Sequence, residues 1–270
     1  MTNILQMPNR GLDYKQVAND ISGWIWNKAK NAWDKWLVVG VSGWVDSAVV
    51  STLCAMSGQA LTVLELPIHQ ATDQVSRAGQ HVAWLKENFW NVTSQIIDLS
   101  KVFDTMQELQ YPGDDEASEY LAGVNLRSRL RMGQIYSTAN RKNSLVVGTW
   151  NKVEDYGIWF FTKYWDGGVD ISPIGELYKS EVRKLSREIW NNSELSEAIA
   201  TDGLHTTWAT DEDQIGCTYN ELEWAMVQYD AWFRSSDLTG RPQEIMQIYT
   251  TRHESNAHKM NMPPVFQLDQ

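Results

Sequence analysis

A short polar turn that could hold a phosphate group follows the first strongly apolar segment of this chain. Residues 37–41 are Leu-Val-Val-Gly-Val, and they lead into Ser42, Gly43 and a second apolar segment that begins after Asp46. Backbone N–H groups of such a turn, together with the positive end of a following helix, can bind an anion. Ser42 and Ser47 add hydroxyl donors, and Asp46 adds a carboxylate suited to Mg²⁺. The pattern therefore predicts a loop that binds nucleotide phosphates.

A second concentration of charged and polar residues lies between positions 148 and 179. It runs Gly-Thr-Trp-Asn-Lys-Val-Glu from 148 to 154 and Phe-Phe-Thr-Lys-Tyr-Trp-Asp-Gly-Gly-Val-Asp from 160 to 170, and Lys179 follows. A lone lysine such as Lys163 would most often lie in solvent, and a lone acid such as Glu154 would most often cap a helix or form a surface ion pair. The context of the whole pattern favours a functional role for them.

The elements that must position these residues follow from the hydrophobic periodicity. We expect an amphipathic helix from Tyr14 to Trp33, with Trp24, Ile25 and Ala29 on one face, and then alternating strands and helices. The expected strands are 36–41, 61–66, 92–99 and 145–149, and the expected helices are 48–56, 73–88 and 125–139.

This alternation predicts an α/β fold with a mostly parallel sheet covered by helices on both faces. Ligands then bind beyond the carboxyl ends of the strands, where the Ser42–Ser47 loop and Thr149 should converge. Residues 111–119 should form an exposed acidic loop, and residues 206–213 could act as a lid. We expect one domain over residues 1–270.

The composition of the chain excludes further classes of partner and location. A net charge of −11 argues against a nucleic-acid partner, and the two cysteines, Cys54 and Cys217, have no metal or disulfide spacing. No apolar segment approaches the ~20 residues of a membrane span and no signal segment opens the chain, so we expect a soluble cytoplasmic protein. Tryptophan is unusually frequent, with 14 residues against 6 phenylalanines.

Taken together, the motifs resemble one enzyme family over nearly the whole chain. The loop is similar to the Ser-Gly-Gly-x-Asp-Ser loop of ATP pyrophosphatases. The remaining motifs resemble those of ammonia-dependent NAD synthetase, and they are Asn125-x-x-x-Arg129-x-Arg131, residues 148–154, residues 160–170, Thr201-Asp202-Gly203-Leu204, Thr210-Asp211-Glu212-Asp213-x-x-Gly216 and His258-Lys259. The resemblance implies a Rossmann-like fold of the adenine nucleotide alpha hydrolase type. It also implies a homodimer, and fewer than 40 residues precede the first strand, so no glutaminase domain is expected.

The resemblance also implies roles for individual residues. Asp46, Lys179 and Asp170 are the implied catalytic residues, and Asp46 and Glu154 the implied Mg²⁺ ligands. The implied ATP contacts are Gly40, Val41, Ser42, Gly43, Trp44, Val45, Asp46, Ser47, Thr149, Lys179 and Thr201, and the implied deamido-NAD contacts are Arg129, Lys163, Asp170, His258 and Lys259.

The reaction implied by the family is the ATP-dependent amidation of deamido-NAD with ammonia. Attack of the deamido-NAD carboxylate on the α-phosphate of ATP gives an acyl-adenylate and pyrophosphate. Ammonia then displaces AMP and leaves the amide of NAD. Because negative charge accumulates at each stage, Mg²⁺ and cationic side chains are needed around the phosphates.

Trp44 stands where the family has the second glycine of the loop. A tryptophan forced to positive φ would be strained by about 1–3 kcal/mol, and its indole could occupy the pyrophosphate space. Trp159 and Trp165 flank the Phe-Thr-Lys segment, and their rings could reshape the side of the site that binds deamido-NAD. Two alternatives therefore stay open. One is a catalytically impaired nucleotide-binding relative or an engineered variant, and the other is an ATP pyrophosphatase of another type, such as the amination domain of GMP synthetase.

Overall fold

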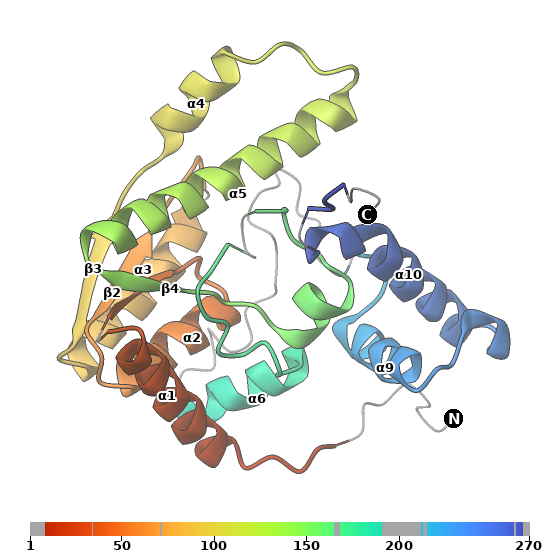
Figure 1. Cartoon of the computed structure of the whole chain (residues 1–270), viewed down its shortest axis with the longest axis horizontal. Coiled ribbons are helices and arrows are strands. Elements are labelled where there is room, and N and C mark those ends of the chain that lie inside the picture. Colours follow the sequence, from red (N-terminus) through yellow and green to blue (C-terminus); the bar gives the residue numbers. More distant parts are fainter. Residues whose placement is uncertain are drawn as a thin grey trace.

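Four parallel strands form one sheet, which lies between helices on the left side of the view in Figure 1. The computed structural model describes residues 9–33, 35–70, 72–164, 168–190, 212, 215–261 and 263–266, without the side chains of residues 72–76. The strands are β1 (Trp36–Gly40), β2 (Leu61–Glu65), β3 (Val92–Ile96) and β4 (Ser144–Val147), in the order β3-β2-β1-β4. Since all neighbours pair in parallel, the carboxyl ends of the strands lie at one edge.

Helices cover both faces of this sheet, as predicted. One face packs against α1 (Tyr14–Asn31), α2 (Val45–Met56), α3 (Thr72–Asn88) and α6 (Lys179–Ile189), and the other packs against α4 (Ser100–Glu108) and α5 (Glu116–Arg141). Alternation along β1 divides its side chains between the two cores. Leu37 and Val39 join the first core and Val38 joins the second.

The first helix differs from its prediction in the face that it buries. Asp13 caps α1 by accepting hydrogen bonds from the backbone N–H groups of Lys15 and Gln16, and the buried residues are Ala18, Ser22, Ile25 and Ala29. Trp24 was expected on this face, but it lies beside the buried stripe and is 39% exposed. The Lys28 ammonium lies 5.3 Å from its ring centroid.

The acidic segment at 111–119 is exposed as predicted, but its second half is helical. Asp115 caps α5 by accepting a hydrogen bond from the Ser118 N–H at 2.7 Å. Glu116 and Glu119 lie in the first turn, where negative charge favours the helix dipole. These local signals start α5 well before the predicted Asn125. The helices at 100–108, 179–189, 219–230 and 241–256 are not among those predicted from the sequence.

The C-terminal helices pack against each other and against α6, on the right side of the view in Figure 1. They are α9 (Tyr219–Asp230) and α10 (Arg241–Asn256), with short 3₁₀ turns η2 (Ser235–Asp237) and η3 (Ala257–Lys259). Their core includes Leu222, Ile245 and Met246, and it contacts a single π-helical turn, η1 (Lys152–Gly157), through Val153. None of the described helices is long and apolar enough to cross a membrane.

The close approach of two segments at the end of β4 depends on Gly148. A Cβ at this position would lie 2.8 Å from Val169 Cγ2, whereas a Cβ at Gly133 on α5 would meet no atom within 4 Å. We expect Gly148→Ala to lower the free energy of unfolding by about 1–3 kcal/mol, because the added methyl overpacks a fixed contact. Urea unfolding measures this. Gly133→Ala is the matched control and should be neutral or stabilising, and equal effects of the two substitutions would contradict the packing argument.

Candidate active site

The predicted convergence of the phosphate loop with the segment after β4 is present in the structure. The strand order reverses direction between β1 and β4, and in open parallel sheets ligands bind at this point, outside the carboxyl ends. The loop after β1 carries Asp46, and the segment after β4 carries Asn151. The Asn151 Nδ2 donates a hydrogen bond to Asp46 Oδ1 at 3.2 Å, which joins the two motifs directly.

The phosphate loop is held closed by Ser47. Its hydroxyl donates to the Trp44 carbonyl at 3.0 Å and accepts from the Ser42 N–H at 3.2 Å. The positive φ of the loop belongs to Gly43, at 85°, while Trp44 is extended with φ −107°. The backbone strain considered for Trp44 is therefore absent, because the neighbouring glycine adopts the left-handed conformation.

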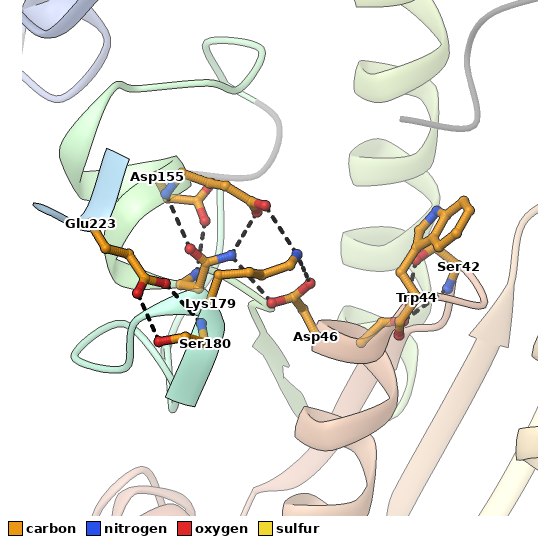
Figure 2. A network of polar contacts seen from close by, with 10 residues as sticks. Ser42, Trp44, Asp46, Asp155, Lys179, Ser180 and Glu223 are labelled. Carbon is orange, nitrogen blue, oxygen red and sulfur yellow. Dashed lines mark hydrogen bonds and ion pairs between the residues drawn. The ribbon is translucent and has the colours of Figure 1, made fainter. Parts of the chain in front are cut away.

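The Trp44 indole nevertheless lies at the ligand side of the loop. It lines a cavity together with Ser42, and Figure 2 shows the two residues beside each other. The Arg77 guanidinium lies 5.1 Å from its ring centroid, a cation–π distance. The large ring therefore takes up space that a glycine would leave to a ligand.

A buried lysine joins the two motifs to a third element (Figure 2). Lys179, the first residue of α6, is 2% exposed, and its Nζ lies 2.5 Å from Asp46 Oδ2 and 3.0 Å from Glu154 Oε1. Two carboxylates and one ammonium leave a net charge of −1. The sequence analysis assigned Lys179 to ATP, and in the structure its ammonium lies between the two predicted metal ligands.

The pKa values of these three groups follow from burial and mutual attraction. Burial raises the pKa of Asp46, and the Lys179 ammonium opposes part of that rise. Burial acts on Glu154 in the same direction, but the ammonium and a hydrogen bond from Tyr219 outweigh it and lower the pKa of Glu154. Burial would lower the pKa of Lys179, and the two carboxylates instead raise it well above its ordinary value. The lysine therefore stays charged at neutral pH.

The π-helical turn η1 aims Glu154 at the lysine. Asn151 caps this turn by accepting a hydrogen bond from the Glu154 N–H at 3.1 Å, and its Nδ2 donates to Glu154 Oε2 at 2.6 Å. Asp155 in turn accepts from the Asn151 N–H at 2.8 Å. Single π-helical turns occur often at functional sites. Asn151 lies in a motif noted in the sequence, but only the structure reveals its bridging contacts.

A fully buried carboxylate positions the start of α6. Glu223 on α9 accepts hydrogen bonds from the Ser180 N–H at 2.8 Å and from the Ser180 hydroxyl at 2.7 Å (Figure 2). Ser180 is the neighbour of Lys179, so this contact fixes the helix end from which the lysine extends. The sequence analysis missed Glu223, since no local pattern distinguishes it from an ordinary helical glutamate.

Most of the predicted site residues surround one cavity of about 760 Å³. Those that line it are Gly40, Val41, Ser42, Trp44, Asp46, Ser47, Arg129, Thr149, Glu154, Lys163, Lys179, His258 and Lys259. Gly43, Val45 and Asp170 do not line it, and Thr201 lies outside the described residues.

The basic side chains of the far wall are anchored to backbone carbonyl groups. Lys259 Nζ donates to the carbonyls of Trp159 at 2.9 Å and Phe161 at 2.7 Å, and Lys163 Nζ donates to the His258 carbonyl at 2.8 Å. Arg129 lies near the same segment, with its Nε 3.4 Å from the Lys163 carbonyl. These contacts tie η3 to residues 159–163 and build a positively charged wall opposite the phosphate loop.

Asp170 does not line the cavity, and its carboxylate has partners on two neighbouring elements. Its Oδ2 accepts a hydrogen bond from the Val146 N–H at 2.7 Å, and the Tyr136 hydroxyl lies 3.4 Å from its Oδ1. The carboxylate therefore binds the backbone of β4 and holds the segment after residue 168 against the sheet.

The carboxylates of Asp46 and Glu154 fit a magnesium ion. One oxygen of each pairs with Lys179 Nζ and the other accepts from Asn151 Nδ2, so the two carboxylates lie side by side. They are hard oxygen donors, and Mg²⁺ commonly binds one or two carboxylates together with phosphate oxygens and waters. The described residues hold no group of three or more metal-binding side chains, so in this part of the chain the remaining ligands would come from phosphate and water.

Comparison with known proteins identifies the family. The family model described as NAD synthase matches residues 17–263 of the chain. The chain belongs to the NAD synthase family. The NH₃-dependent NAD⁺ synthetase of Methanosarcina acetivorans is 33% identical to it, over 95% of this chain and 100% of that protein. That of Syntrophomonas wolfei is 35% identical over 92% and 94% of the two chains.

Solved structures confirm the fold expected for this family. The NH₃-dependent NAD synthetase of Campylobacter jejuni matches with a TM-score of 0.74 and 24% identity, over 95% of this chain and 100% of that one. The NMN synthetase of Francisella tularensis matches with a TM-score of 0.80 at the same identity and coverage. The Rossmann-like, adenine nucleotide alpha hydrolase type of fold predicted from the sequence is thereby confirmed.

Removing the Lys179 ammonium should destabilise the fold in a pH-dependent way. Lys179→Met leaves two uncompensated buried carboxylates, and breaking a buried ion pair costs about 3–5 kcal/mol. Without the ammonium, burial raises the pKa of both carboxyls above their unfolded values, so the lost stability should be larger at pH 8 than at pH 5. Urea unfolding at the two pH values measures this.

Lys152→Met provides the matched control. Lys152 Nζ lies 3.0 Å from Glu176, whose side chain is 87% exposed, and such surface pairs contribute about 1 kcal/mol or less. If Lys179→Met lost the same stability at both pH values, the buried carboxylates would not be the source of the loss.

Proposed function

We propose that this protein is an ammonia-dependent NAD synthetase, a ligase that forms a carbon–nitrogen bond. The observation that carries the proposal is the buried cluster of Asp46, Glu154 and Lys179 at the junction of the phosphate loop and the cavity. Membership of the NAD synthase family supports it, and so does the basic wall on the other side of the cavity. An intact charged cluster favours catalysis over the alternative of an impaired nucleotide-binding relative.

The chemistry requires that the substrate carboxylate be activated before nitrogen can enter. A carboxylate oxygen of deamido-NAD attacks the α-phosphorus of ATP, and the bond to the bridging oxygen of pyrophosphate breaks. Ammonia then adds to the acyl carbon, AMP leaves with the C–O bond electrons, and a proton is lost to give the amide. The loop N–H groups and the N-terminus of α2 would hold the phosphates in line for the first displacement.

The buried cluster supplies the countercharge for this displacement. Asp46 and Glu154 would hold Mg²⁺, which neutralises the ATP polyphosphate when it is bound. Lys179 is our candidate for stabilising the charge on departing pyrophosphate, because its ammonium stays protonated beside the loop. Thr149 would contact ATP from the end of β4, and Thr201 is retained as a proposed ATP contact.

The opposite wall of the cavity would bind deamido-NAD. Arg129, Lys163, His258 and Lys259 line it, and the arginine and the two lysines carry the positive charge that a dinucleotide pyrophosphate requires. Asp170 would act indirectly, by holding residues 168–170 against β4, and this contact makes it a positioning residue in our proposal. The single domain and the cytoplasmic location stay predictions from the sequence.

A direct assay tests the proposed reaction. The purified protein is incubated with deamido-NAD, ATP, Mg²⁺ and ammonium, and NAD, AMP and pyrophosphate are quantified by chromatography. We expect the three products in equal amounts. Nicotinic acid mononucleotide serves as a second acid substrate, because one structural relative carries the name NMN synthetase. Amidation of the mononucleotide without amidation of deamido-NAD would show that the mononucleotide is the substrate. ATP hydrolysis without amide formation would refute the proposed ligase activity.

Asp46→Asn should weaken the use of Mg²⁺-ATP. The amide keeps the size of the side chain but loses the negative charge that would bind the metal. We expect kcat/KM to fall by at least about tenfold and the Mg²⁺ concentration for half-maximal rate to rise. Steady-state rates over a Mg²⁺ titration measure both. An unchanged Mg²⁺ dependence would remove Asp46 from the metal site.

Trp44→Gly should raise turnover. The indole lines the cavity beside the phosphate loop, and its removal gives the phosphates access to the loop N–H groups. NAD formation at saturating ATP measures the effect, with Trp24→Ala on α1 as a control remote from the cavity. Equal or lower turnover of the glycine variant would show that the enzyme accommodates the ring.

A homodimer is proposed as the functional assembly. The projecting part of α4 and α5 exposes Val102, Leu109, Tyr120 and Leu121, and the last two also line the cavity (Figure 1). A second copy covering this surface would complete the cavity wall. In a sedimentation experiment we expect the parent protein to behave as a dimer and the Leu121→Glu variant as a monomer. A monomeric parent protein with full activity would contradict the proposal.

A further inference from the structure

Several tryptophans occupy backbone conformations that are typical of glycine. Among the described residues, six that are not glycine have positive φ, and they are Trp33, His69, Asn143, Trp159, Tyr164 and Trp232. Three of these six are tryptophan, although tryptophan makes up only 14 of the 270 residues. Asparagine and histidine are enriched at positive φ, but a bulky aromatic residue has no such preference.

Two of these tryptophans follow helix ends at the position that glycine usually takes. Trp33 lies two residues after the end of α1, has φ 67°, and donates its backbone N–H to the Lys30 carbonyl at 3.1 Å. Trp232 lies two residues after the end of α9, has φ 68°, and donates to the Tyr229 carbonyl at 3.0 Å. This geometry is the left-handed helix cap, for which glycine is strongly favoured.

The side chains at these positions do not account for the choice of tryptophan. Trp33 is 90% exposed and Trp232 is 81% exposed, so their rings bury little surface. The indole N–H of Trp159 is buried without a hydrogen-bond partner, and the same holds for Trp150 and Trp190. Buried indole N–H groups normally find a partner.

We infer that glycine stands at positions 33, 159 and 232 in the protein as its own cells make it, and that UGA codons at these positions are read there as glycine. The meaning of UGA differs between genetic codes. A gene that uses UGA for glycine yields this sequence when UGA is translated as tryptophan. One reassigned codon accounts for the positive φ of the three tryptophans and for the unpartnered indole N–H of Trp159.

The inference has a direct consequence for the phosphate loop. If the codon for residue 44 is also UGA, the loop runs Ser-Gly-Gly-Val-Asp-Ser and the ring that lines the cavity is absent. The same substitution would leave Gly43 with its positive φ and would open the ligand side of the loop.

The gene sequence and the mass of the native protein test the inference. We expect UGA codons at 33, 159 and 232, and peptides from protein isolated from its own cells that carry glycine at each position. Tandem mass spectrometry identifies the residue. UGG codons at these positions, or native peptides that contain tryptophan there, would overturn the inference.

A second measurement uses the purified protein and does not depend on its activity. At positions 33 and 232, glycine and alanine both remove the indole, but only glycine adopts positive φ without strain. We expect the midpoint of thermal unfolding of each glycine variant to exceed that of the matched alanine variant by about 2–4 °C.

Trp24 provides the control position, since it lies inside α1. Here the order should reverse, and Trp24→Gly should unfold at a lower temperature than Trp24→Ala. Alanine variants at 33 and 232 that equal or exceed the glycine variants would overturn the conformational basis of the inference. This result stands apart from any failure of the proposed reaction, which only the product assay reports.

Discussion

The arrangement of the site depends on one buried ammonium group that satisfies two carboxylates. Lys179 holds Asp46 at the start of α2 and Glu154 in the turn η1, so the lysine links three segments that are distant in sequence. Removing three charged groups from water is costly, and the cost is offset only when each of them finds its partner. The cluster therefore forms only when the sheet, η1 and α6 have reached their native positions.

The sheet and the C-terminal helices each fix one side of this cluster. Parallel pairing of β1 with β4 brings Asp46 near Asn151, and Glu223 on α9 fixes Ser180 beside the lysine. The cavity thus has the loop of residues 42–47 on one wall and the positive side chains of Arg129, Lys163 and Lys259 on another. Two reacting molecules that both carry phosphates suit such a site. Although the net charge of the protein is negative, it can still bind them because positive charge is concentrated at the cavity.

The four strands and the turn after the first of them were predictable because their signals are local. Apolar runs mark the strands, and Ser42, Gly43 and Asp46 form a turn whose chemistry is legible without the fold. The partners of Lys179 were not predictable in this way, since Asp46 is 133 residues away, and Glu223 is 43 residues from Ser180. Asp170 shows the same limit, because its carboxylate turns to the Val146 N–H of a neighbouring strand. The start of α5 was missed although its capping signal at Asp115 is local.

The hydrogen bonds of Lys259 affect the order in which the two walls of the cavity can form. Its ammonium holds carbonyl groups of Trp159 and Phe161, about 100 residues earlier in the chain. During synthesis the sheet and the phosphate loop emerge long before this lysine, so they can assemble while the opposite wall still lacks its support. The enzyme would therefore form its nucleotide loop before its second substrate wall, because that wall is complete only once Lys259 has been synthesised.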